Sequence, residues 1–195
     1  MTDGKYRVLL LTEHPVQYNA YLWKATARHP NRANIPGSYL VFAGDGPLRT
    51  DLENEARNFG IAGHVRFLGF VNQTGLPQVY ASSDVLVLPS EYEQFGLVMN
   101  EAMLCGCRAI VSDRVGAKYD LVRDGETGCV YPCADVGALA GILRSALGDL
   151  PKLAEKSRAA SARIDTWTPE IAVEAFVECI EVAIRNSAAA ARDPK

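Results

Sequence analysis

Short apolar runs alternate with longer segments of helical periodicity along most of the chain. The apolar runs are bounded by Gly, Pro, Asp or Ser, and they predict strands at residues 6–12, 39–43, 65–68, 85–88, 109–111 and 129–131. The run at 85–88 contains only Val and Leu, which is typical of a strand buried on both faces. The alternation predicts an α/β fold: a doubly wound, Rossmann-like parallel sheet of about six strands with helices on both faces.

Helices are expected between and after these strands, and the last of them is unusually apolar. The sequence predicts helices at residues 16–28, 48–59, 73–81, 96–105, 117–122, 136–147, 151–164 and 169–186. The apolar residues of the last helix extend over more than the ~100° stripe of a surface helix. They are Ile171, Val173, Phe176, Val177, Ile180, Val182 and Ile184. Because large apolar surfaces mark interfaces, we expect a homodimer through this helix, with docking back onto its own domain as the alternative.

Composition limits the class of protein. The 195 residues are 48% hydrophobic and 22% charged, with a net charge of −3, as in a globular domain of ordinary size. Nothing is basic enough to suggest nucleic acid, and no apolar stretch approaches the ~18 residues of a transmembrane segment. The five cysteines show no spacing typical of a metal site or a disulfide framework. They predict free thiols in a cytoplasmic, reducing environment.

Two glutamates eight residues apart follow the run at 85–88. Glu93 is expected in the loop after the strand, and Glu101 one to two turns into the next helix. The first N–H groups of a helix have no intrahelical partner and favour an anion. A helix N-terminus between two carboxylates that can accept hydroxyl groups therefore suits a nucleotide-sugar.

The segment around these glutamates resembles the donor-binding motif of the retaining glycosyltransferases of family 4 (glycosyl transferases group 1), which have the GT-B fold. Further segments fall in the order and spacing of that family: 42–49, 65–71, 80–90, 100–106, 110–112, 115–117 and 124–128. The resemblance covers residues 38–149. It implies one half of a GT-B fold, namely the C-terminal domain that binds the donor.

The resemblance implies roles for the residues around the glutamate pair. Glu101 would bind the ribose hydroxyls, and Glu93, the main catalytic candidate, would bind hydroxyls of the donor sugar. Phe95, Gly96 and Leu97 would offer backbone N–H groups to the phosphates, with Gly96 allowing a close approach. Each role has a plainer alternative: a solvated loop carboxylate for Glu93, a charge on the helix face for Glu101, and an ordinary helix start for residues 95–97.

Weaker candidates lie in neighbouring loops. Gly44 and Gly46 belong to the family's strand-end loop, although Asp-Gly at a strand end is often only a turn. Phe70 and Val71 would contact the base through main-chain atoms, or belong to the core. His14 follows the first strand, where open α/β sheets bind ligands, and could approach the phosphates as a second catalytic candidate. A lone His before Pro is more often a turn residue.

The front of the chain departs from the family pattern. A complete GT-B enzyme has two such domains, which need about twice this length. We interpret residues 1–37 as a remnant strand and helix from the start of the N-terminal domain, 38–187 as the nucleotide-sugar-binding domain and 188–195 as a tail. The remnant would replace the first strand and helix of the donor domain. The family's Gly-Arg and Lys, which hold the diphosphate, are absent there, and Glu13 carries the opposite charge.

These features predict a glycosyltransferase-type domain that binds a nucleoside-diphosphate sugar for transfer with retention, weak or inactive alone. A non-catalytic nucleotide-binding or regulatory module is the alternative, and a sugar-nucleotide epimerase of the same fold is less favoured. No Asp-x-Asp motif is present, so we expect no cofactor and no metal. The sequence leaves open the base and sugar of the donor, and whether the acceptor is a saccharide or lipid-linked.

Overall fold

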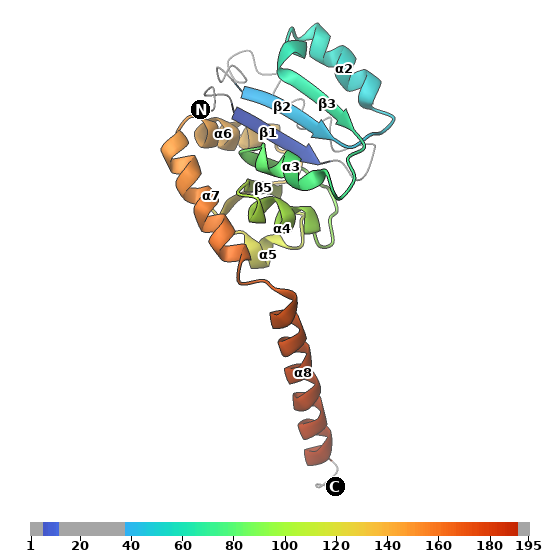
Figure 1. Ribbon diagram of the computed structural model, residues 1–195, viewed down its shortest axis with the longest axis vertical. Helices are drawn as coiled ribbons and strands as arrows, with labels where there is room; N and C mark the ends of the chain where they lie inside the picture. The colour runs from blue at the N-terminus through green and yellow to red at the C-terminus, as the bar shows by residue number, and fades with distance from the viewer. Residues whose placement is uncertain (1–5, 12–37, 191–195) are drawn as a thin grey trace.

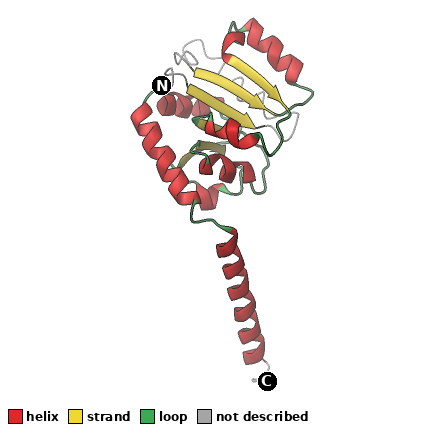
Figure 2. Cartoon of the chain, in the orientation of Figure 1, coloured by secondary structure: helices red, strands yellow, loops and turns green. Residues whose placement is uncertain are grey.

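The computed structural model describes residues 6–11 and 38–190. They contain a six-stranded sheet whose strands pair in parallel in the order β3-β2-β1-β4-β5-β6 (Figure 1, Figure 2). The strands are β1 (Tyr6–Leu11), β2 (Ser38–Ala43), β3 (Val65–Gly69), β4 (Val85–Leu88), β5 (Arg108–Ser112) and β6 (Gly128–Tyr131). This is the strand order of doubly wound nucleotide-binding sheets. The predicted α/β fold with about six strands is confirmed.

Helices cover both faces of the sheet (Figure 1). One face packs against α2 (Arg49–Asn58) and α6 (Val136–Leu147). The other packs against α3 (Leu76–Ala81), α4 (Leu97–Leu104) and α5 (Lys118–Leu121). The next helix, α7 (Leu150–Ile164), contributes buried side chains to both layers. A single turn of 3₁₀ helix, η1 (Ala62–His64), precedes β3.

Strand β4 shows how the sequence pattern produces the two layers. Val85, Leu86 and Val87 are 0% exposed, and Leu88 is also buried. Val85 and Val87 join the cluster beneath α2 and α6, whereas Leu86 and Leu88 join the cluster beneath α3 and α4. Full burial of one such side chain contributes roughly 1.5–3 kcal/mol. The prediction of burial on both faces is therefore confirmed.

The helix bounds follow local hydrogen bonds. Both α6 and α7 begin after an aspartate: Oδ1 of Asp135 accepts the N–H of Ala138 at 2.9 Å, and Oδ1 of Asp149 accepts that of Lys152 at 3.1 Å. α3 begins at Leu76, not at residue 73, because the side chain of Asn72 forms a turn that accepts the N–H of Gly75 at 2.9 Å. The predicted helix at 16–28 lies outside the described residues.

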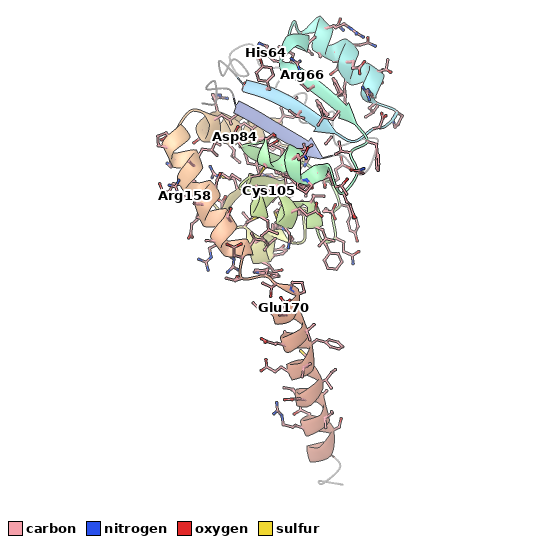
Figure 3. The ribbon with its side chains drawn as sticks, viewed as in Figure 1. His64, Arg66, Asp84, Cys105, Arg158 and Glu170 are labelled. Carbon is pink, nitrogen blue, oxygen red and sulfur yellow. The ribbon has the colours of Figure 1, made fainter. Side chains whose placement is uncertain are left out.

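The last helix, α8 (Pro169–Ala190), projects away from the body of the protein, and its side chains extend outward from Glu170 onward (Figure 1, Figure 3). All its described side chains, from residue 169 to 187, are exposed. The structure therefore does not show the docking of this helix onto its own domain. The helix also continues past residue 186 into the predicted tail, because residues 188–190 are all Ala, the strongest helix former.

Candidate functional site

The arrowheads of β1, β2 and β3 lie at one edge of the sheet (Figure 1). Since all six strands are parallel, their carboxyl ends meet at this edge, and the strand order reverses between β1 and β4. In open α/β sheets, ligands bind at this switch point. The loop after β4 carries Glu93 and leads directly into α4. The structure thus places the first glutamate and the start of α4 at the edge where a ligand is expected.

Glu93 is half-buried, and its own loop holds its carboxylate. Oε1 accepts the N–H of Gly96 at 3.0 Å and the N–H of Phe95 at 3.3 Å. Among the described residues, no group donates to Oε2 of Glu93. Two of the three N–H groups that the resemblance assigns to phosphates therefore already have an acceptor. The third N–H group belongs to Leu97, the first residue of α4. The first N–H groups of a helix have no intrahelical partner.

Gly96 has a conformation that favours glycine. Its φ of 83° and ψ of 46° are left-handed. A Cβ at this position would lie 3.1 Å from Cγ1 of Val115 and 3.4 Å from Cδ2 of Leu88, both buried side chains. Gly96 turns the chain from the Glu93 loop into α4, so the geometry of that loop depends on it.

Glu101 lies on the second turn of α4 and is exposed. Its Oε2 accepts a hydrogen bond from the hydroxyl of Tyr80 at 2.7 Å. Tyr80 belongs to α3 and is only 1% exposed, so this contact fixes the carboxylate against a rigid part of the core. Among the described residues, Oε1 of Glu101 has no hydrogen-bond donor. Sequence reasoning missed Tyr80, because nothing in its neighbourhood distinguishes it from an ordinary core aromatic residue.

Gly44 and Gly46 lie at the carboxyl end of β2. Gly44 has a φ of 123°, and its N–H donates to the carbonyl oxygen of Gly69 at 2.8 Å. The N–H of Gly46 donates to Oδ1 of Asp45 at 2.9 Å. The first bond joins the loop after β2 to the end of β3, and the second forms a local turn at Asp45 and Gly46. Both lie at the same edge of the sheet as the glutamates.

Phe70 and Val71 follow β3 and differ in their surroundings. Phe70 is 82% exposed, so of the two alternatives the one that places it in the core is wrong. Val71 is partly buried and packs against the cluster beneath α3 and α4. Phe70 directly follows Gly69, the last residue of β3, whose φ of 69° lies in the left-handed region that favours glycine.

Two arginines at this edge were not among the predicted site residues. Arg49 begins α2, and its guanidinium lies 3.0 Å from Glu53 and 3.7 Å from Asp45. Arg114 follows β5 and is 3.7 Å from its neighbour Asp113, with both side chains largely solvated. Both arginines add positive charge at this edge of the sheet, and each lies beside one or two carboxylates. His14 and Glu13 lie outside the described residues.

Residues 6–11 and 38–190 contain neither a cluster of metal-ligating side chains nor a helix suited to cross a membrane. In these ranges no three His, Cys, Asp or Glu side chains are grouped so that they could hold a metal ion. No helix in the same ranges has the length and apolar character needed to cross a membrane.

The strand order and the loops at its carboxyl edge define a doubly wound, Rossmann-like α/β domain. The family model for glycosyl transferases group 1 matches residues 15–163, and the chain belongs to this family. The match extends beyond residues 38–149 at both ends.

Curated relatives agree with this assignment. The chain is 34% identical over 150 residues to the glycogen synthase of Mycobacterium tuberculosis, covering 76% of this chain and 36% of that protein. It is 34% identical over 164 residues to the D-inositol 3-phosphate glycosyltransferase of Mycobacterium avium, covering 79% of this chain and 38% of that protein. The chain thus spans little more than a third of the length of these relatives.

Solved structures show the same fold. Anabaena Alr3699/HepE in complex with UDP superposes with a TM-score of 0.77 at 24% identity, over 92% of this chain and 49% of that one. The C-terminal domain of a glycosyl transferase group 1 family protein (LpcC) from Francisella tularensis superposes with a TM-score of 0.71 at 21% identity, over 84% and 86% of the two chains. The chain therefore has the fold of one part of these glycosyltransferases.

Proposed function

We propose that this chain is the C-terminal, donor-binding domain of a retaining glycosyltransferase of family 4. The observation that carries the proposal is the arrangement of Glu93 and Glu101 around the start of α4 at the switch point of the sheet. Each carboxylate has one oxygen held by a protein donor, and its other oxygen has no donor among the described residues. Family membership and the UDP complex of the Anabaena protein support a nucleoside-diphosphate sugar as the ligand.

In this proposal Oε1 of Glu101 accepts the ribose hydroxyls, and Oε2 of Glu93 accepts hydroxyls of the donor sugar. The diphosphate lies at the start of α4, where the N–H of Leu97 and the helix dipole favour negative charge. The base lies toward Phe70 and Val71, and the turn at Gly44 and Gly46 borders it.

In the proposed reaction the glycosyl group is transferred with retention of configuration at its anomeric carbon. The bond between the anomeric carbon and the diphosphate breaks, and an acceptor hydroxyl attacks from the same face. The protein contributes positioning and stabilisation of the departing diphosphate. His14, which follows β1, is the proposed additional group near the phosphates. The acceptor is a saccharide or a lipid-linked molecule held largely by a second domain, so we expect this chain alone to be a weak or inactive transferase.

Calorimetric titration with UDP, GDP and ADP tests the donor site. We expect one of them to bind, and Glu101→Ala to weaken it by about 1.5–3 kcal/mol, the range for a hydrogen bond to a charged group. Glu55→Ala is the matched control, because Glu55 is an exposed carboxylate on α2. The proposal fails if no nucleotide binds, or if both variants lose affinity equally.

A non-catalytic nucleotide-binding module would use the same site, and the absence of the family's Gly-Arg and Lys from residues 12–18 favours this second candidate. The two functions differ in turnover. Release of UDP from UDP-glucose, or of GDP from GDP-mannose, in the presence of saccharide acceptors indicates a transferase. Binding without release over the same period indicates the module, and conversion of the sugar to an epimer without an acceptor would indicate an epimerase.

We propose that binding and transfer need no metal, so EDTA should leave both unchanged. We also propose a cytoplasmic location, in which the five cysteines would remain reduced thiols.

We also propose that α8 pairs with α8 of a second copy. One stripe of the helix carries large apolar side chains at spacings of three and four residues, and all are exposed: Val173, Phe176, Val177, Ile180 and Ile184. Glu170, Glu174 and Glu181 border one flank of the stripe, and the small Ala172 and Ala183 border the other. In an antiparallel pair the two acidic flanks would face each other, whereas in a parallel pair each would face the small flank. The charges favour the parallel pair.

Sedimentation tests this arrangement. We expect a dimer that Phe176→Glu combined with Ile180→Glu converts to a folded monomer, whereas the control Glu178→Gln leaves it intact. Ala183→Lys should strengthen a parallel dimer, because the lysine would face the partner's acidic flank. A monomeric wild-type chain at high concentration would refute the dimer.

A further inference from the structure

We propose that the loop after β5, residues 113–117, positions Glu93 for recognition of the donor sugar, and that Gly116 is the residue on which this depends. The inference rests on the proposed function, since it concerns the backbone from which the Glu93 carboxylate projects. Gly116 touches no reacting atom in this view. It is a positioning residue.

Three backbone hydrogen bonds join this loop to the loop after β4. The N–H of Gly116 donates to the carbonyl oxygen of Glu93 at 2.8 Å, and the N–H of Ala117 donates to that of Phe95 at 2.9 Å. The N–H of Glu93 donates in turn to the carbonyl oxygen of Arg114 at 3.3 Å. Among the described residues, these are the backbone bonds that hold residues 93–95 to another part of the chain. The position of Glu93 therefore follows that of residues 114–117.

The loop after β5 is itself anchored in the core. Val115 and Ser112 are both 0% exposed. The hydroxyl of Ser112 donates to the carbonyl oxygen of Ser90 and accepts the N–H of Arg114 at 3.2 Å. The N–H of Cys133, after β6, donates to Oδ1 of Asp113 at 2.9 Å. A loop fixed at so many points transmits a local displacement to its less restrained neighbour, the Glu93 loop.

At Gly116 the loop after β5 lies directly against the backbone of the loop after β4. A Cβ at this position would lie 1.9 Å from the carbonyl oxygen of Gln94 and 2.9 Å from its carbonyl carbon. These are backbone atoms, so no side-chain rotation relieves the contact. A normal separation exceeds 3.0 Å, so any side chain must move the loops apart by more than an ångström. That displacement breaks the bonds of 2.8 and 2.9 Å, which are lost beyond about 3.5 Å.

The displacement should affect the sugar more than the nucleotide. Glu93 is proposed to contact the sugar, and a site residue about an ångström out of place loses most of its hydrogen bonding. Glu101 is held separately by Tyr80 of α3. We therefore expect Gly116→Ala to weaken a sugar nucleotide about tenfold and the bare nucleoside diphosphate less than about threefold.

The control is Gly141→Ala on α6. Gly141 has no atom within 4 Å of a Cβ, so the same substitution there adds a methyl group to open space. Hydrogen exchange of residues 93–97 gives a readout that needs no ligand: it should rise in Gly116→Ala and remain unchanged in Gly141→Ala. Titrations with UDP and UDP-glucose, and with GDP and GDP-mannose, give the second readout.

A second variant covers the case in which Gly116→Ala does not fold. Ala117→Pro removes the N–H that bonds to Phe95, and the φ of −63° at Ala117 suits proline. It should raise exchange at 93–97 in the same way. Unchanged exchange in both variants, or equal losses of sugar nucleotide and bare nucleotide, would overturn the inference. If the wild-type chain binds none of the four ligands, the proposed function fails, while exchange still decides whether residues 114–117 hold the Glu93 loop.

Discussion

Removal of the Glu93 carboxylate should have opposite effects on a nucleoside diphosphate and on its sugar derivative. In the structure Oε1 of Glu93 accepts the N–H groups of Phe95 and Gly96, which the family resemblance assigns to phosphates. A diphosphate entering this loop meets an anion that already occupies the two donors. Glu93→Ala removes that anion and frees both N–H groups, but it also removes the proposed acceptor for the sugar hydroxyls.

Two opposing contributions set the change in binding free energy: lost charge repulsion for UDP and lost hydrogen bonds for the sugar. Two unit charges ~4 Å apart interact by about 1 kcal/mol in water and about 4 kcal/mol at an effective dielectric constant of 20. Glu93 is only half-buried, so the low value applies, and UDP should bind about 1 kcal/mol more tightly, or roughly fivefold. Loss of hydrogen bonds to a charged acceptor costs about 1.5–3 kcal/mol. After subtraction of the gain, UDP-glucose should bind about 0.5–2 kcal/mol more weakly.

Calorimetric titration of the wild-type chain, Glu93→Ala and Glu93→Gln at two salt concentrations measures both effects. The gain for UDP should shrink at high salt, because screening weakens the repulsion that has been removed. Glu93→Gln, which keeps the size of the side chain and loses its charge, should show the same gain for UDP. Weaker UDP binding in both variants would refute the reasoning, since it would mean that the carboxylate orders the loop for the phosphates instead of competing with them.

Two further results are expected. Tyr80→Phe should weaken nucleotide binding by about 1 kcal/mol, because Glu101 loses the 2.7 Å hydrogen bond that fixes it; an unchanged affinity in titration would show that Glu101 is positioned without Tyr80. Burial, with smaller contributions from Cys105 and Asp84, raises the pKa of Cys107 from its ordinary 9.0 to about 12, so the folded state keeps a proton that the unfolded state releases. The stabilisation that comes from the protonated Cys107 thiol should therefore be fully present below pH 9 and be lost as the pH rises toward 12. In urea unfolding, the free energy of unfolding should fall less over this range in Cys107→Ala than in the wild-type chain.

The sheet could be predicted from the sequence because burial leaves a pattern along the chain. All six strands were expected, and β4 shows the reason: four consecutive apolar residues have no polar face to present to water, so only a strand between two helical layers accommodates them. The beginning of α6 was predicted to the residue, since the side chain of Asp135 bonds to the N–H of Ala138 within one helical turn. Local bonds and periodic burial are both visible in a linear sequence.

Burial of a single loop residue is less visible. Phe70 and Val71 are adjacent and apolar, and the sequence left both between the base site and the core. In the structure Phe70 is 82% exposed and Val71 packs inward. Both residues follow a turn at the end of β3, where Gly69 has a left-handed φ of 69°. A glycine in a sequence shows that such a turn is allowed, not in which direction the next side chain points.

The polar contacts of the site were the least predictable part, for a related reason. Tyr80 and Glu101 are separated by 21 residues, and their hydrogen bond joins two helices whose sequences give no sign of it. The family resemblance included residues 115–117, but the reason for a glycine at 116 is the carbonyl oxygen of Gln94, a backbone atom that is identical in every residue type. Apolar burial selects residue types and so leaves a pattern. Backbone contacts between loops restrict only the room for a side chain. In the sequence this restriction is therefore visible only as a glycine at one position.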